Sequence, residues 1–170
     1  MGLLPDEADY NLQNHLTFNW SDLNIDLMYY LTVKSKFAAA HRIVGYEGCC
    51  AQFHGHNFGV EVMVGAEKLN GLGMAIDFKK LKGLVDGVIS EFDHQDLNEL
   101  PHFHEVNPTS ESLAKYIYDQ LKPLILPPLA LSSVTISETE GYRVTYREGF
   151  GISKNSQTGG SLNGVDPLQA

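Results

Sequence analysis

Residues 54–67 read HGHNFGVEVMVGAE, and this stretch decides the fold of the chain. Its apolar residues alternate with small or polar ones, which is the two-residue period of a strand with one buried face. Residues 31–41 alternate in the same way, and His41 falls on their apolar face. Both stretches are therefore predicted to be strands. The residues that share the apolar face of residues 54–67 are His54, His56, Phe58, Val60, Val62 and Val64.

Two amphipathic helices are predicted further along the chain. Asp77 can cap a helix over residues 78–92, because apolar residues recur there at three- and four-residue steps. Thr109 is a plausible cap of a second helix with the same spacing, which ends around Pro123. The stretch between the two helices shows no regular period.

Further strands complete the predicted fold. The Asn70-Gly71 pair predicts a turn, after which residues 73–76 would return as a strand and close a hairpin. Residues 134–138 and 142–146 alternate and predict a closing antiparallel pair. Apart from the short return strand, the order is strand, strand, helix, helix, strand, strand, so the fold class is α+β, with a four-stranded antiparallel sheet and both helices on one face. Small sheets of this kind often cover their second face by oligomerising.

Length, composition and charge narrow the function classes. The 170 residues fit one domain, expected over residues 31–150, with an N-terminal extension over 1–30 and a mobile Gly/Ser/Asn-rich tail over 151–170. Twelve Lys plus Arg against 21 Asp plus Glu give a net charge of −9. This sign argues against nucleic acid and anionic membranes as partners. Without an apolar run long enough to span a bilayer, the protein is expected to be cytoplasmic.

Three histidines form the strongest candidate site. His54 and His56 are two residues apart on one predicted strand, so their imidazoles point to the same side, and His41 lies on the buried side of the preceding strand. Three protein ligands that leave a fourth position open are typical of catalytic zinc, whereas structural zinc usually has four ligands, mostly Cys. The alternative is three core or loop histidines satisfied by hydrogen bonds. The combination of H-G-H with a third histidine favours a metal site.

Three further residues are candidates for proton transfer. Cys50 stands four residues before His54, where a nearby dication would stabilise its thiolate. The alternative for Cys50, or for its neighbour Cys49, is a small buried hydrophobic residue. Asp93 and His94 are adjacent and could relay protons, although this dipeptide taken alone favours an Asp cap beside a surface His.

Glu138 is a candidate for ligand binding. It falls on the apolar side of its predicted strand, where an unpaired carboxylate would be costly to desolvate. The partner it needs could be structural, such as Arg143 or Arg147. It could equally be a ligand edge with two parallel N–H donors, which a carboxylate accepts in bidentate fashion.

Taken together, these residues lie in motifs that resemble the 6-pyruvoyl-tetrahydropterin synthase superfamily, and within it the bacterial 6-carboxy-tetrahydropterin synthase branch. H-G-H alone is a weak signal, but six motifs occur in order over roughly residues 31–147. Three residues separate Cys50 from the H-G-H, as in the carboxy branch. The motifs are FAAAHRI, CCAQFHGHNF, MAIDFKKLK, FDHQDLN, NPTSESLAKYI and VTISET.

The resemblance implies a role for each candidate residue. It implies that zinc is bound by His41, His54 and His56, that catalysis uses Cys50, Asp93 and His94, and that the pterin is anchored by Glu138. It further implies the tunnelling fold, in which subunits assemble around a barrel, most often as a hexamer, with the active sites between them.

The implied reaction converts 7,8-dihydroneopterin triphosphate to 6-carboxy-5,6,7,8-tetrahydropterin, acetaldehyde and triphosphate, in deazapurine and queuosine biosynthesis. Two alternatives stay open: a 6-pyruvoyl-tetrahydropterin synthase, which eliminates triphosphate without carbon–carbon cleavage, and a pterin- or metal-binding homologue without catalysis. A triphosphate also needs local cations to offset the negative net charge, and Arg42, Lys34 and Lys36 are candidates.

Overall fold

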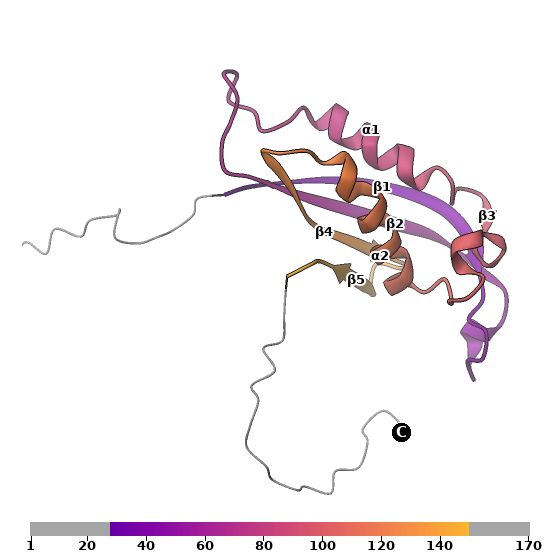
Figure 1. Cartoon of the computed structure of the whole chain (residues 1–170). Coiled ribbons are helices and arrows are strands. Elements are labelled where there is room, and N and C mark those ends of the chain that lie inside the picture. Colours follow the sequence, from indigo (N-terminus) through magenta and orange to yellow (C-terminus); the bar gives the residue numbers. More distant parts are fainter. Residues whose placement is uncertain (1–27, 150–170) are drawn as a thin grey trace, which may run out of the picture.

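A long antiparallel hairpin forms the centre of the computed structural model, which describes residues 28–149 (Figure 1). Its strands are β1 (Tyr29–His41) and β2 (His54–Ala66), which pair over their whole length with His41 opposite His54. Val33, Phe37 and Ala39 of β1 are buried, as are Phe58 and the alternating valines of β2. The strands predicted at residues 31–41 and 54–67 are thus confirmed.

Two helices cover the apolar face of the sheet (Figure 1). Asp77 caps α1 (Phe78–Ile89) by accepting from the backbone N–H of Lys79, and Thr109 caps α2 (Ser110–Leu121) by accepting from that of Ser112. Both predicted caps are therefore confirmed. Helix α1 ends three residues earlier than predicted, and Phe92 beyond it is still fully buried in the core.

The sheet has five strands, in the order β3-β1-β2-β4-β5. Strands β4 (Leu129–Ser137) and β5 (Arg143–Tyr146) form the predicted closing pair. The prediction of four antiparallel strands was wrong in one respect, because β3 (Gln95–Asp96) pairs in parallel with the edge of β1. A two-residue strand in a polar stretch shows no alternation, so its pairing was invisible in the sequence. The sheet of this chain is open, with β3 and β5 at its edges.

The strand predicted at residues 73–76 was also wrong. A turn occupies this region, in which the Asn70 carboxamide oxygen accepts from the N–H groups of Leu72 and Met74. Gly73 adopts a φ of 75° there, which glycine tolerates without strain. The side chain of Asn70 satisfies the backbone groups that a hairpin would have paired, so the chain passes directly into α1.

Four short 3-10 turns complete the described chain: Cys49–Ala51, Leu97–Glu99, Pro101–Phe103 and Lys122–Leu124. The predicted tail, and all but the last residues of the predicted extension, lie outside the described residues. Within residues 28–149, no helix is both long enough and apolar enough to cross a bilayer.

Candidate active site

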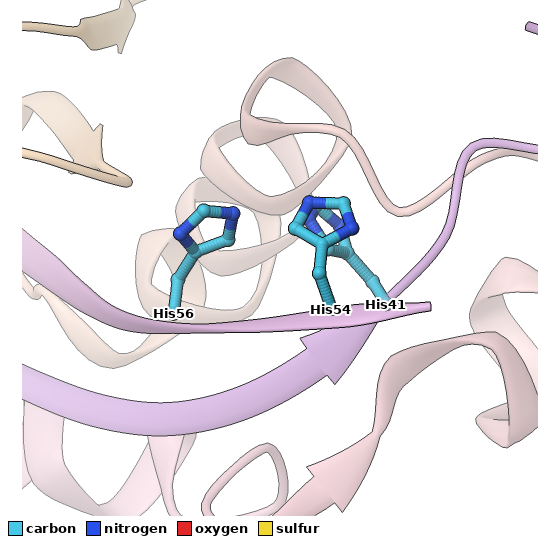
Figure 2. Close-up of side chains that lie close together, drawn as sticks. All are labelled: His41, His54 and His56. Carbon is cyan, nitrogen blue, oxygen red and sulfur yellow. The ribbon is translucent and has the colours of Figure 1, made fainter. Parts of the chain in front are cut away.

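The register of β1 and β2 brings the three predicted metal ligands together (Figure 2). His41 lies opposite His54, and His56 lies opposite Ala39, so all three side chains leave the same face of the hairpin. The ring centroids are 4.7 Å apart for His41–His54, 5.4 Å for His41–His56 and 4.9 Å for His54–His56. One nitrogen of each ring lies within 4.8 Å of the others, which makes this cluster a candidate metal site.

For His41 and His54, hydrogen bonds indicate which ring nitrogen can face a metal. Nδ1 of His41 lies 2.7 Å from the carbonyl oxygen of Pro108, and Nδ1 of His54 lies 2.7 Å from that of Gln52. A carbonyl only accepts, so both Nδ1 atoms carry the proton and both Nε2 atoms keep a lone pair. A ring N–H that donates to a backbone carbonyl is typical of metal-binding histidines.

The Nε2 atom of His41 gives the clearest sign of a missing partner. It is buried, and it has no hydrogen-bond partner in the described part of the chain. Burial also lowers the pKa of the His56 imidazole, while the negative charge of Glu138 acts in the opposite direction. Neutral imidazoles with free lone pairs are the form that binds a first-row metal, so the donor set fits such an ion.

A cavity of about 500 Å³ adjoins the cluster. It contains Cys50 and Glu138, both predicted from the sequence, together with His41 and His54. It also contains Ser110, which the sequence analysis did not single out. The remaining lining residues are Ile43, Thr109, Glu111, Gly141, Tyr142, Arg143 and Val144.

Cys50 sits in the short turn between β1 and β2, with its Sγ atom 3.9 Å from that of Cys49. The hydrogen bond with Cys49 raises the pKa of the Cys50 thiol above its ordinary value, and desolvation and the charges of Cys49 and Glu138 act in the same direction. The metal-free site therefore favours the neutral thiol. A dication bound at the neighbouring histidines would act in the opposite direction and favour the thiolate.

Glu138 lies immediately after β4 and is partly buried. Its Oε1 atom accepts a hydrogen bond of 2.9 Å from the hydroxyl of Ser110, the first residue of α2. The sequence had suggested Arg143 or Arg147 as structural partners, and had not identified Ser110. Ser110 belongs to the NPTSE motif, but no periodicity in the sequence shows that it meets a residue 28 positions away. The hydroxyl holds the carboxylate in a fixed orientation at the cavity.

Asp93 and His94 form the predicted pair, but they lie apart from the cavity of Cys50. The Nδ1 atom of His94 is 3.0 Å from Oδ2 of Asp93, and Oδ1 of Asp93 accepts from the N–H of Ala38. The hydrogen bond from the Ala38 N–H is the largest cause that lowers the pKa of the Asp93 carboxyl. Desolvation acts in the opposite direction, and the neighbouring His94 lowers the pKa further. His94 lines a second cavity of about 540 Å³, together with Phe53 and strand residues of β1 and β2.

Comparison with known proteins identifies relatives over the same region. A family model described as 6-pyruvoyl tetrahydropterin synthase matches residues 30–149. The 6-carboxy-5,6,7,8-tetrahydropterin synthase of Rickettsia felis is 32% identical over 109 residues, covering 54% of this chain and 79% of that protein. The dihydroneopterin monophosphate aldolase of Pyrococcus furiosus is 34% identical over 111 residues, covering 65% and 90%.

The fold has close structural relatives as well. The structure of Caenorhabditis elegans 6-pyruvoyl tetrahydropterin synthase superposes with a TM-score of 0.65 at 29% identity, covering 72% of this chain and 97% of that one. The names of these relatives describe three different reactions of pterins, so the names alone do not identify the product.

Proposed function

Because the chain belongs to the 6-pyruvoyl tetrahydropterin synthase family, we propose that it converts 7,8-dihydroneopterin triphosphate and water to 6-carboxy-5,6,7,8-tetrahydropterin, acetaldehyde and triphosphate. The observation that carries the proposal is the cavity that Cys50 and Glu138 share with His41 and His54, two of the three clustered histidines. The product would supply deazapurine nucleosides such as queuosine. The spacing of Cys50 and the H-G-H supports this branch, whereas the likeness to the nematode structure favours the pyruvoyl synthase as the second candidate.

The chemistry divides among the residues of the site. Zinc held by His41, His54 and His56 would supply Lewis-acid polarisation of the side-chain oxygens of the substrate. Glu138, oriented by Ser110, would accept the two parallel N–H donors of the pterin edge. Cys50 would remove a proton from the substrate side-chain carbon that this polarisation makes more acidic.

The scheme also needs groups that exchange protons with the side-chain hydroxyls of the substrate. We propose Asp93 and His94 for this role. Within one subunit, His94 lines a different cavity from Cys50. We propose that the chain forms a homo-oligomer, most simply a hexamer built around a barrel, in which this pair completes the site of a neighbouring subunit. The open sheet, with free edges at β3 and β5, supports such an assembly.

Mixing two inactive variants tests the shared site. We expect Cys50→Ala and Asp93→Ala each to be inactive alone, and co-refolded mixtures to recover activity. If the two variants mix at random, about one quarter of the sites combine an intact Cys50 with an intact neighbouring Asp93. A site built within one subunit would recover nothing, so an inactive mixture of assembled oligomers contradicts the proposal. Activity of the mixture is the measurement.

Arg143 is the residue that we propose for the triphosphate. Of the candidates named from the sequence, Lys34 is paired with Glu61 at 2.8 Å, and Arg42 lines a different cavity. Arg143 is the one cationic residue among those lining the cavity of Cys50. Since this cavity also contains Glu111 and Glu138, an anionic substrate needs a local counter-charge there.

Replacing Arg143 by Ala is expected to raise the KM for the triphosphate substrate about tenfold or more, because a charge-assisted contact is lost. Affinity for unphosphorylated neopterin, measured as competitive inhibition, should stay the same. Lys36→Ala is the matched control, because Lys36 is absent from the lining of this cavity. An equal loss of affinity for both ligands would show that Arg143 does not contact the phosphates.

A product assay tests the reaction itself. Zinc-loaded protein is incubated with 7,8-dihydroneopterin triphosphate, and the products are identified by mass spectrometry. The carboxypterin together with acetaldehyde is the expected result. A pyruvoyl product without acetaldehyde would establish the second candidate, and no turnover with the metal verifiably bound would establish a non-catalytic homologue.

A further inference from the structure

One segment, residues 93–107, lies along the outer edge of β1 and of the loop that follows this strand. In a strand, the backbone N–H and C=O groups of alternate residues point to the same edge. At Ala38 these groups are met by the Asp93 side chain and the His94 backbone, and β3 pairs with the strand at Ala40. Beyond His41 the regular strand has ended, yet the same edge continues to be paired.

Two asparagine side chains provide this continuation. The Asn98 carboxamide accepts from the N–H of Arg42 at 2.8 Å and donates to the carbonyl of the same residue at 3.0 Å. The Asn107 carboxamide makes the same pair of bonds with Val44, at 2.8 and 2.9 Å. A carboxamide carries one acceptor and a donor in one plane, so each asparagine replaces the backbone of a neighbouring strand residue.

The segment held in this way is hydrogen-bonded to Cys50. Ile43 lies between the two anchored residues, and its N–H donates to the carbonyl of Cys50 at 2.8 Å. The residue next to Asn107 is Pro108, whose carbonyl fixes the ring of His41. The asparagines therefore connect the loop of Cys50 to the same polypeptide segment that orients a metal ligand.

We propose that Asn98 and Asn107 are positioning residues, which hold Cys50 at a fixed place relative to the metal-ligating histidines. The assignment rests on the proposed function, because it gives Cys50 its role. Neither asparagine lines the cavity of Cys50, so the effect is transmitted through the backbone of residues 42–44. Cys50 lies in the short turn Cys49–Ala51, and catalytic steps are sensitive to displacements of about 1 Å.

Asn107→Ala and Asn98→Ala are expected to lower kcat about tenfold or more, because the thiol is misplaced, with KM and zinc content unchanged. Asn70→Ala is the matched control, because its carboxamide also accepts from two backbone N–H groups but lies in the turn before α1. Asn107→Asp tests the geometry further, since a carboxylate accepts from Val44 but cannot donate to it. An equal fall of kcat in Asn70→Ala, or no fall in the first two variants, would overturn the proposal.

A second measurement separates this inference from the proposed reaction. In a Cys49→Ser background, the rate at which iodoacetamide alkylates Cys50 reports the freedom of the loop whether or not the protein turns over the pterin. Loss of Asn107 is expected to change this rate about threefold or more, because the hydrogen bonds that hold the loop are lost. The Asn70→Ala variant should react at the parental rate. Alkylation rates unchanged by loss of either positioning residue would contradict the proposal even if the enzyme has another substrate.

Discussion

Cys50→Ala is expected to retain the metal and to lose nearly all turnover. His41 and His54 are oriented by the carbonyls of Pro108 and Gln52, and Cys50 takes no part in these hydrogen bonds, so we expect metal binding not to require the thiol. Removing the group that takes a proton in the rate-determining step costs about 10²- to 10⁴-fold in rate. Metal content by atomic absorption and kcat with 7,8-dihydroneopterin triphosphate are the two measurements.

The neighbouring thiol provides the control for this prediction. Cys49 is exposed and does not line the cavity, so Cys49→Ala should retain turnover. The hydrogen bond with Cys49 is the largest cause that raises the pKa of the Cys50 thiol. Losing this bond lowers that pKa and increases the thiolate fraction of Cys50 at a given pH. The rise of rate with pH should therefore begin at lower pH in this variant. Full activity of Cys50→Ala would refute the role of the thiol.

The sequence predicted the cluster of three histidines well because strand geometry is short-ranged. Once residues 31–41 and 54–67 are strands of one hairpin, their alternation alone places the three histidines on one face. The register that sets His41 opposite His54 follows from the burial of Phe37 against Phe58, whose ring centroids are 5.1 Å apart. The helix caps were predictable for the same reason, since an N-cap acts within three residues.

Contacts between segments far apart in the sequence were harder to predict. Ser110 and Glu138 meet because α2 packs on β4, a tertiary relation that leaves no period in either stretch. The pairing of β3 rests on two residues, too few for alternation to be recognised. Asp93 and His94 were predicted as a pair and do form one, but only the fold shows that His94 lines a different cavity from Cys50. Their separation is the reason for proposing a shared site.

His54→Ala is expected to abolish stoichiometric metal binding and, with it, activity. Two imidazoles hold a first-row ion far more weakly than three. His54 is the better choice than His41, because His41 is 2% exposed and its truncation would also open a cavity in the core. Metal content after dialysis is the measurement.

Thermal unfolding gives this prediction a readout that does not depend on the reaction. An ion that binds only the folded state stabilises it by about 2.7 kcal/mol at a hundredfold excess over its dissociation constant. A chelator should therefore lower the Tm of the wild-type protein and leave that of His54→Ala unchanged. His104→Ala is the matched control, because this exposed histidine lines a different cavity and should keep both the metal and the chelator effect. Unchanged metal stoichiometry in His54→Ala would show that His54 is not a ligand of the bound ion.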